Sequence, residues 1–385
     1  MKNISLKNAW RTLPLRMVLF LPLIFFQGDQ GVQFQFVEVD SLVAGDCKAV
    51  GDLDGDGYPD LVVGGMPGEG LNWYRNSDWN RTVIASPNIE FTTDCSLGDL
   101  DGDGDPDIVV PDGNSGNNLF WFQNPKPNGN PAIGPSWVRH TVGSVGDWGK
   151  DIKIADFDQD RRLDIATRGH GTAMIFFQTA PNTWAKTLLN VSSLGSEGLG
   201  LGDVDGDGRT DLVVQGAWLK NPGGSAARAG GNWLEYAIGG VDVSFKAMVA
   251  DINGDGKPDV VFSSSEGTDD VAWWSCGPAG PTGPWTKNVI VSNLDRAHTL
   301  QAADLDGDGD LDVVTAQMHT SVDREVAVWF NLDRRGTLWR KQVVAASGLH
   351  NGQVADVNRD GRPDIFGANW TGNPPVKLWL NLPGI

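Results

Sequence analysis

The sequence predicts an all-β fold built from seven similar units, and three observations support this prediction. The first is an acidic stretch, GDLDGDGYPDLVV at Gly51, whose frame returns six more times along the chain. The second is a spacing of 47, 57, 47, 48, 53 and 52 residues between successive leading aspartates. The third is a set of strand-like segments after each stretch. Self-similarity at a period of roughly 50 residues is the signature of a repeat architecture. The leading aspartates are Asp52, Asp99, Asp156, Asp203, Asp251, Asp304 and Asp356.

Each unit is predicted to contain four strands. In the first unit the acidic stretch leads into a β-branched run at 61–63, and the aromatic segment LNWYRN follows at Leu71. A further segment, WNRTVI, opens with Trp79, and an apolar segment precedes the acidic stretch. Short apolar runs bounded by turn residues indicate strands. This pattern differs from an EF-hand, in which helices flank the loop.

The acidic stretches have the composition of calcium-binding loops. Calcium takes about 6–8 oxygen ligands from carboxylates and carbonyls, whereas magnesium keeps several waters and fits less well. In the pattern D-x-D-x-D-G-x-x-D, the first, third, fifth and ninth positions supply side chains, and the glycine permits a left-handed backbone. We therefore predict up to seven calcium ions. The predicted ligands are Asp52, Asp54, Asp56 and Asp60; Asp99, Asp101, Asp103 and Asp107; Asp156, Asp158, Asp160 and Asp164; Asp203, Asp205, Asp207 and Asp211; Asp251, Asn253, Asp255 and Asp259; Asp304, Asp306, Asp308 and Asp312; and Asp356, Asn358, Asp360 and Asp364.

Three loops depart from the pattern. Asn253 and Asn358 stand at the third position, where each keeps an oxygen but removes a charge. Arg161 replaces the glycine of the third loop. The third site is therefore predicted to be the weakest.

This arrangement of loops and strands resembles the FG-GAP and VCBS repeat family, whose calcium-looped blades also occur in integrin alpha chains. The resemblance covers about residues 33–382 through seven matching loops. It implies a seven-bladed β-propeller with calcium between the first and second strand of each blade. Radial repetition of four-stranded sheets agrees independently with the strand pattern.

The two ends of the chain predict how the ring closes. The segment VQFQFVEV at 32–39 precedes the first loop, and the last unit stops after its third strand, at Leu382. The N-terminal strand is therefore expected to complete the last blade; the alternative is a frayed N-terminal arm.

Residues 1–30 are predicted to be a signal peptide. Lys2, Lys7, Arg11 and Arg16 precede the apolar run MVLFLPLIFF, which is too short to span a bilayer. Residues 31–385 are then expected to form a single propeller domain without a transmembrane segment. The protein is expected to be secreted or extracellular; the alternatives are a periplasmic location, a surface location and an N-terminal segment retained as an anchor. Export suits the loops, because weak calcium sites fill where calcium is abundant.

Charge and cysteine content narrow the function classes. The formal net charge is -19 and the pI is about 4.5, with more than half of the acidic residues in the loops, so nucleic-acid binding is not expected. We expect a monomer. Cys47 and Cys95 precede adjacent loops, so the sequence is compatible either with a disulfide between them or with two free thiols. Cys276 is expected to be a buried free thiol.

Polar residues are predicted to gather at the face opposite the calcium loops. Inner strands of about five residues put the two faces roughly 17 Å apart. The residues five or six positions before each leading aspartate should therefore surround one mouth of the ring, joined by the loops between second and third strands. These candidates are Asp46, Asp94, Lys150, Asp151, Arg168, His170, Glu197, Lys246, His298, His319, His350, Asn351 and Trp370.

Three function classes follow. The first is binding of a carbohydrate or acidic glycan, with Trp370 as an apolar platform. The second, which the resemblance allows, is a polysaccharide lyase or sugar dehydratase, in which Lys150 or Arg168 neutralises a carboxylate while His319 and His350 exchange protons. In a variant of it, these two histidines and His298 hold a metal. The third class is a protein-binding adhesion scaffold. A purely structural role, in which neighbouring backbone satisfies these side chains, is the alternative to all three.

Overall fold

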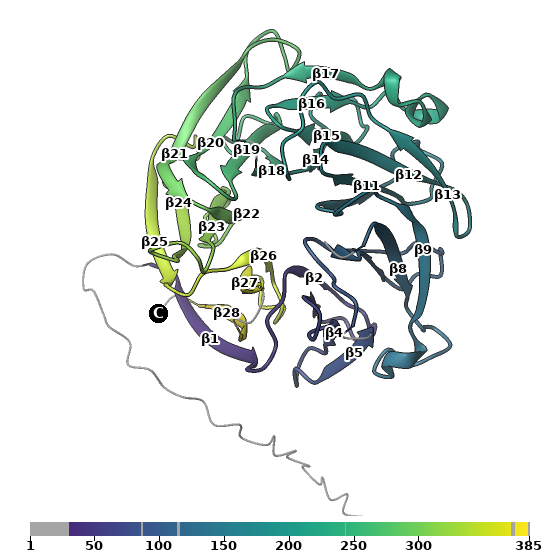
Figure 1. The fold of residues 1–385 in the computed structure, drawn as a ribbon. Coiled ribbons are helices and arrows are strands. Elements are labelled where there is room, and N and C mark those ends of the chain that lie inside the picture. The colour runs from purple at the N-terminus through teal and green to yellow at the C-terminus, as the bar shows by residue number, and fades with distance from the viewer. Residues whose placement is uncertain (1–30, 86–87, 114–115, 243, 371–373, 384–385) are drawn as a thin grey trace, which may run out of the picture. The chain divides into compact units, whose positions relative to one another are not determined.

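The structure is a computed structural model that describes residues 31–85, 88–113, 116–242, 244–370 and 374–383. The unit Val32–Ile385 contains seven four-stranded antiparallel sheets. These sheets follow one another around a ring in chain order (Figure 1). The predicted all-β, seven-bladed propeller is therefore confirmed. The predicted signal peptide lies outside the described residues.

The blades are numbered here by their acidic loops. Blade 1 contains β2 (Cys47–Gly51), β3 (Asp60–Gly64), β4 (Leu71–Tyr74) and β5 (Arg81–Ala85). Blade 2 contains β6 (Ser96–Gly98), β7 (Asp107–Pro111), β8 (Asn118–Gln123) and β9 (Val138–Ser144). Blade 3 contains β10 (Ile152–Ala155), β11 (Asp164–Gly169), β12 (Thr172–Ala180) and β13 (Thr183–Leu188). Blade 4 contains β14 (Gly200–Gly202), β15 (Asp211–Val214), β16 (Ala217–Lys220) and β17 (Leu234–Ala237).

The remaining blades have the same strand order. Blade 5 contains β18 (Phe245–Ala250), β19 (Asp259–Ser264), β20 (Thr268–Cys276) and β21 (Trp285–Asp295). Blade 6 contains β22 (Ala297–Ala303), β23 (Asp312–Gln317), β24 (Val326–Asn331) and β25 (Trp339–Ala345). Blade 7 contains β26 (His350–Ala355), β27 (Asp364–Ala368), β28 (Val376–Leu382) and β1 (Gln33–Asp40). Short 3-10 helices lie at Gly134–Ser136, Gly224–Arg228 and Gly230–Asn232.

The N-terminal strand closes the ring. Strand β1 pairs antiparallel with β28, in a register that runs from Gln33 opposite Leu382 to Asp40 opposite Val376. In Figure 1 the purple β1 lies beside the yellow β28, so the two ends of the described chain share one blade. The predicted strand at 32–39 is confirmed with a shift of one residue. The frayed-arm alternative is wrong, because β28 offers β1 a complete backbone edge.

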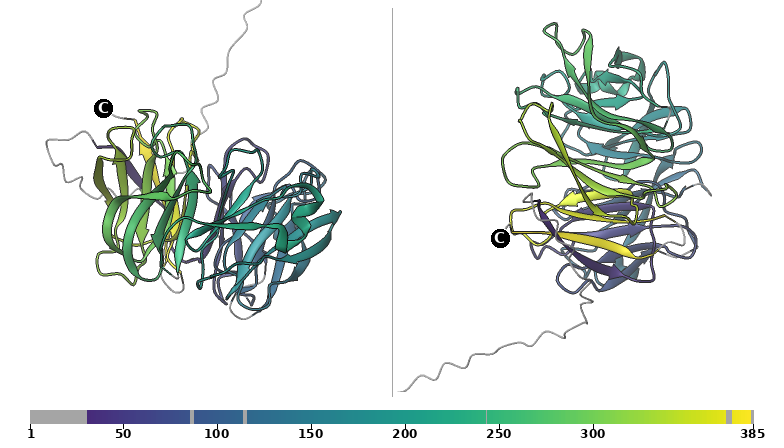
Figure 2. Two further views of the ribbon diagram at one scale, coloured as in Figure 1. Left: turned by 90° about the horizontal axis from the view of Figure 1, so that it is seen from above. Right: turned by 90° about the vertical axis from the view of Figure 1, so that its left-hand side faces the viewer.

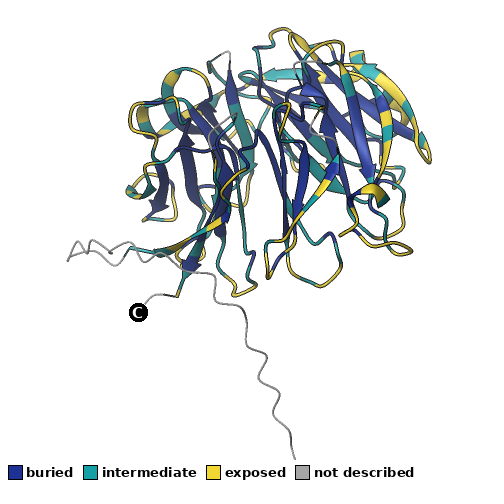
Figure 3. Ribbon diagram, turned by 60° about the horizontal axis from the view of Figure 1, so that its bottom comes forward, coloured by how far each residue is buried: buried dark blue, intermediate teal, exposed yellow. Residues whose placement is uncertain are grey.

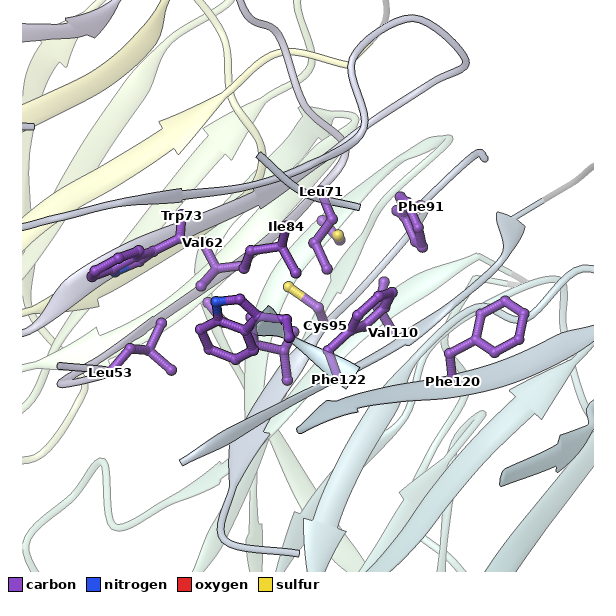
Figure 4. Packing of buried hydrophobic residues seen from close by; sticks show 14 residues of the cluster. Leu53, Val62, Leu71, Trp73, Ile84, Phe91, Cys95, Val110, Phe120 and Phe122 are labelled. Atoms are coloured by element: carbon purple, nitrogen blue, oxygen red, sulfur yellow. The ribbon is translucent and has the colours of Figure 1, made fainter. Parts of the chain in front are cut away.

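The hydrophobic core lies between the blades. Seven clusters of buried apolar side chains are present among the described residues, and each joins two neighbouring blades. Figure 4 shows the cluster between blades 1 and 2, where Trp73 and Val62 face Cys95 and Phe122. Second strands are buried along their whole length, whereas outer strands carry most of the exposed positions (Figure 3). The β-branched and aromatic strands of the repeat therefore supply both faces of each interface.

Each acidic loop closes on its ninth residue, an aspartate that opens the second strand. In blade 1, Asp60 accepts a hydrogen bond from the Leu53 N–H through Oδ2, at 3.0 Å, and one from the Asn76 N–H through Oδ1, at 2.7 Å. The same Oδ2 bond recurs in all seven blades at 2.9–3.0 Å. We call these residues the closing aspartates: Asp60, Asp107, Asp164, Asp211, Asp259, Asp312 and Asp364.

In six of the seven blades, an amide side chain at the end of the third strand connects the blade to the one before it. Asn124, for example, donates from Nδ2 to the Leu53 carbonyl of blade 1, at 2.9 Å. We call this hydrogen bond the inter-blade amide bond. It recurs at 2.7–3.0 Å from Asn76 to Val357, Gln178 to Leu100, Asn221 to Phe157, Asn331 to Ile252 and Asn381 to Leu305.

Blade 5 lacks this amide. Cys276 stands where the other blades have asparagine or glutamine, and a thiol has no amide donor for the Val204 carbonyl of blade 4. The thiol is free and half-buried, so the prediction of a free thiol is supported but that of full burial is wrong. The position lies at the strand end beside solvent, where the blade is less covered than in its middle.

Removing an inter-blade amide should destabilise the propeller. Asn381→Ala leaves the backbone bond to Asp364 in place but deprives the buried Leu305 carbonyl of its donor. An unsatisfied buried group costs about 1–3 kcal/mol, and urea unfolding should show a loss in that range.

The converse substitution tests the same bond at blade 5. Cys276→Asn should be more stable than Cys276→Ser by about 1 kcal/mol, the typical net value of one hydrogen bond. Equal stability of the two variants, together with an undiminished Asn381→Ala protein, would contradict a stabilising role for this bond.

Candidate functional site

The acidic loops are preformed by their own backbone. In loop 1 the Asp52 carboxylate accepts N–H bonds from Gly55 (2.7 Å), Asp56 (3.1 Å) and Gly57 (2.8 Å). Gly55 and Gly57 have φ values of +73° and +90°, which an L-residue adopts only with strain. The loop therefore curls its carboxylates toward one point without a ligand.

Aspartates of these loops converge as a cation site requires. In each of the first four loops the first, third and ninth residues bring one carboxylate oxygen apiece to within 4.8 Å of the others. Burial raises the pKa of the closing aspartates, to about 6 for Asp60 and Asp364 and to about 7 for Asp107, Asp164, Asp211, Asp259 and Asp312. A divalent cation would offset this cost, so the donor set fits calcium.

Basic side chains form ion pairs with aspartates of loops 1, 2, 3, 4, 6 and 7, among them Arg75 with Asp54 at 2.9 Å in loop 1. In loop 3, Arg161 adopts the left-handed conformation (φ 72°), and Arg228 of blade 4 forms ion pairs with Asp158 and Asp160. In loop 4, Lys220 forms an ion pair with Asp205 and lies 2.9 Å from Asp207. A guanidinium thus already neutralises the loop that the sequence predicts to be weakest.

The polar candidates gather at the opposite ends of the inner strands. Strands run between the two faces of the ring (Figure 2), and the acidic loops join first to second strands. His350 opens β26 and pairs with Ala368, after which the chain reaches Trp370. We call this end the mouth: the residues that open the inner strands and the loops that join second to third strands.

One half of the mouth is rich in carboxylates. His298 Nε2 lies 3.1 Å from Glu197 Oε1 and 3.6 Å from Glu266 Oε1, and Lys150 Nζ lies 3.9 Å from Glu197 Oε2. Although burial alone would lower it, the Glu197 carboxylate raises the pKa of His298 above its ordinary value. The charges of Lys246 and His298 overcome burial to hold the pKa of Glu197 well below its usual range. These groups come from blades 3 to 6.

His350 occupies the centre of the mouth. Its ring stacks on that of His298 with a centroid distance of 3.7 Å, and its Nδ1 lies 2.5 Å from Asp46 Oδ1. Burial, followed by the charge of His298, lowers the pKa of His350 to about 4. His350 is therefore a neutral imidazole at pH 7, oriented by Asp46.

The other half of the mouth is electropositive and aromatic. The Trp370 ring lies 5.9 Å from His319 and 6.3 Å from His350, measured between centroids. Beneath it, Lys377 donates to the carbonyls of Ser347 (3.0 Å) and Gly348 (3.1 Å). Burial lowers the pKa of Lys377 to about 8.

A second buried lysine reinforces this charge. Lys48 is fully buried and donates to the carbonyls of Asp46 and His350, and burial lowers its pKa to about 8. Burial and the charges of Lys377, Arg324 and Lys48 together lower the pKa of His319. Lys48 and Lys377 therefore place positive charge near His319, and the Asp46 carboxylate offsets part of the charge of Lys48.

Other predicted site residues lie inside the channel or apart from its centre. Asp94, Asp151, Lys246 and Asn351 line a polar cavity of about 70 Å³, with room for a few water molecules or an ion. Within it Lys246 lies 3.5 Å from Asp151, and Lys153 lies 3.1 Å from Asp94.

Arg168 and His170 do not join the cluster. Arg168 is fully buried and donates to the carbonyls of Gly195 and Gly198, which fixes the segment before β14. His170 is exposed, with its ring 5.8 Å from that of Trp148.

Sequence reasoning missed four residues of the mouth: Lys48, Trp148, Glu266 and Lys377. Trp148 is half-buried, and the Lys150 ammonium lies 3.3 Å from its ring centroid. Lys377 had a signal, because it interrupts an aromatic strand at a position where blades 2, 5 and 6 have Phe120, Ala272 and Ala327. No sequence signal marked Glu266, because a single polar residue in a turn, here the one between β19 and β20, is common in any protein.

The cysteine alternatives are also resolved. Cys47 and Cys95 are buried free thiols, and Cys47 contributes to the raised pKa of Cys95 after burial itself. The bridge that the sequence left open is absent from the structure. Both side chains belong to the core cluster between blades 1 and 2, in which Figure 4 labels Cys95.

Fold and loops together define a class of protein: a seven-bladed β-propeller with cation-type loops on one face. The family model described as FG-GAP-like repeat matches residues 52–110, 99–167, 156–214 and 251–315, together more than half of the chain. The chain therefore belongs to the FG-GAP-like repeat family, as the resemblance implied.

Solved structures confirm the fold. The Vibrio cholerae biofilm matrix protein Bap1 superposes with a TM-score of 0.55 at 10% identity, covering 92% of both chains. BBS1N, in a complex with ARL6DN, superposes with a TM-score of 0.56 at 11% identity, covering 92% of this chain and 98% of that one. The comparison with curated proteins gave no significant match. No helix among the described residues is long and apolar enough to cross a membrane.

The buried lysine of β28 should leave a signature in the pH dependence of stability. Between its folded pKa of about 8 and the ordinary value of 10.5, Lys377 is protonated only in the unfolded chain, so stability should rise with pH. At about 1.4 kcal/mol per pKa unit this amounts to about 3 kcal/mol. Lys377→Met should remove the share of Lys377 and leave that of Lys48, whose pKa burial also lowers to about 8, so the rise in urea midpoint from pH 7 to pH 10 should be about halved.

An exposed lysine serves as the control. Lys186→Met, on the outer strand β13, should leave the pH dependence as it is in the unmodified protein. A Lys377→Met protein with the unmodified slope would contradict the assigned pKa.

Proposed function

We propose that this protein is a secreted, calcium-stabilised propeller that binds an acidic carbohydrate at its mouth. Residues 1–30 direct export, and residues 31–385 act as a single-domain propeller. Calcium fills the loops at one face and the glycan occupies the other. The FG-GAP-like family and the structural likeness to Bap1, a biofilm matrix protein, are consistent with this proposal.

One observation carries the binding proposal: the Trp370 ring lies 5.9 Å from that of His319, whose pKa the charges of the buried Lys377 and Lys48 help to lower. Sugar rings stack on tryptophan through their apolar C–H faces, and the Trp370 ring is half-buried at the mouth. The nearby Lys48 and Lys377 supply positive charge that a carboxylate or sulfate would complement. His319 Nδ1 and Trp370 Nε1 are buried and have no hydrogen-bond partner among the described residues. Together these groups suit an acidic sugar better than a neutral one.

A second function, eliminative cleavage of a uronate polysaccharide, is favoured by the Asp46–His350 pair. A carboxylate that orients a neutral imidazole is a common arrangement for a general base. The pKa of about 4 makes His350 a weak base at pH 7, because general bases work best with a pKa near the operating pH. This ranks binding ahead of catalysis.

Calcium should stabilise the protein through its loops, and least through the third. A ligand that binds only the native state, at a concentration 100 times its Kd, adds about 2.7 kcal/mol per site. Chelation should therefore lower the melting temperature strongly. Asp52→Asn should reduce the calcium-dependent part of that shift, whereas Asp156→Asn should reduce it less, because Arg228 already neutralises loop 3. Differential scanning fluorimetry with calcium and with chelator measures both.

Two outcomes would contradict the calcium proposal. One is a melting temperature that does not respond to chelator in calcium-free buffer. The other, specific to the third loop, is an equal loss of calcium response in the Asp52→Asn and Asp156→Asn proteins.

Trp370→Ala should weaken binding of uronate oligosaccharides by at least tenfold, because it removes the ring on which the sugar stacks and which fixes the orientation of the sugar. His319→Ala should weaken it less, and both variants should keep the calcium-dependent melting shift. Trp184→Ala, on the outer strand β13, is the matched tryptophan control. Calorimetric titration against uronate, sulfated and neutral oligosaccharides measures the affinity and the preference for acidic sugars.

Binding that is equal for acidic and neutral sugars, or unaffected by Trp370→Ala, would contradict the proposed site. The same polysaccharides can be followed for unsaturated products by ultraviolet absorbance. Product that forms with the unmodified protein but not with His350→Ala would place catalysis ahead of binding.

A further inference from the structure

A second kind of metal site lies in the acidic half of the mouth. We propose that Glu197, Glu266 and His298 bind a divalent transition-metal ion, separately from the calcium loops. The His298 Nε2 atom lies 3.1 Å from Glu197 Oε1 and 3.6 Å from Glu266 Oε1, and the three ligand atoms lie within 4.8 Å of one another. Tetrahedral zinc with bonds of about 2.0–2.1 Å separates its ligand atoms by about 3.4 Å. The two measured distances lie on either side of that value.

Two of these atoms are buried without a hydrogen bond. The His298 side chain is 1% exposed and that of Glu197 is 3% exposed. Among the described residues, His298 Nε2 and Glu197 Oε1 have no hydrogen-bond partner, because their contact is not aligned for one. Buried polar atoms are nearly always satisfied, and leaving them unpaired is costly. A cation between the ring nitrogen and the carboxylate oxygens satisfies both.

Asn351 fixes which nitrogen of His298 is free for a metal. The Asn351 amide nitrogen donates to the Thr93 carbonyl at 2.5 Å, which leaves Oδ1 to accept from His298 Nδ1 at 3.1 Å. Nδ1 keeps its proton on Asn351 while Nε2 faces Glu197 and Glu266, so a metal ion bound there would displace the second proton that the charged imidazole carries on Nε2. Metal-binding histidines typically carry such an oxygen partner on the other ring nitrogen.

The ligand set and its access define the class of ion. One imidazole nitrogen and two carboxylate oxygens suit zinc and similar divalent d-block ions, whereas calcium requires more oxygen ligands. Glu266 is 49% exposed, so an ion enters from solvent and keeps an open coordination position. Lys246, whose positive charge helps to keep Glu197 ionised, also lies 3.5 Å from Asp151. This inference does not depend on glycan binding, which is assigned to the Trp370 side of the mouth.

Zinc titration of tag-free protein tests the site. Chelator-treated protein is returned to excess calcium, so that the acidic loops are filled, and zinc is then added in a calorimeter. We expect one zinc ion per chain. Glu266→Gln and His298→Ala should each weaken zinc binding at least tenfold, since even second-shell changes cost about 10–100-fold. Cobalt in place of zinc should give visible absorption bands that both variants lose.

His140→Ala is the matched control, because His140 lies on the outer strand β9. It should bind zinc like the unmodified protein. Glu266→Gln changes a half-exposed side chain and should fold normally, which keeps the test decisive if His298→Ala does not fold. Absence of zinc binding, or equal binding by Glu266→Gln, would overturn the proposal. In that case His298 is a doubly protonated imidazolium paired with both glutamates, which nitrogen-detected NMR would show.

Discussion

The closing aspartate of each acidic loop is the group on which the rest of this structure depends. One of its oxygens accepts a hydrogen bond from the N–H of the second loop residue, and the other accepts one from an N–H at the end of the third strand of the same blade. The side chain at that strand end then reaches the preceding blade: Asn124 does so from blade 2 to Leu53. One carboxylate therefore holds a loop, a sheet and an inter-blade contact in register.

The same residue links the fold to metal binding. A carboxylate that opens a buried strand is costly as an anion, and burial raises the pKa of Asp107, for example, to about 7. Its backbone partners offset part of that cost, and a cation held by the first and third loop residues would offset more. In loop 3, Arg228 supplies positive charge from the neighbouring blade. A propeller of this type can thus neutralise a loop either with a metal or with a side chain.

Separation of the two faces leaves the mouth free to specialise. The loops and closing aspartates repeat with little change around the ring, whereas each blade contributes a different residue to the mouth. Polar groups that no longer repeat divide into an acidic half around His298 and an electropositive half around Trp370, with the neutral His350 between them. The two proposals, a cation at His298 and an acidic glycan at Trp370, correspond to these two halves. A fold alone does not specify them, because function resides in the side chains of the site.

The sequence by itself determined what repeats. Local patterns that recur about every 50 residues predict the loop chemistry, the four strands per blade, the seven blades and the closure by the N-terminal strand. Such patterns can be read without knowing which distant residues are in contact. It also placed Glu197, His298 and His350 at one end of the inner strands, since strand length fixes where a residue leaves the sheet. Only the tertiary structure decided which of these side chains meet. Glu197, Glu266 and His298 come from three blades, Lys48 and Lys377 become neighbours through ring closure, and Arg168 turns away into a buried segment. These contacts depend on the rotation between neighbouring blades and on the direction of each side chain, and the repeated sequence pattern predicts neither.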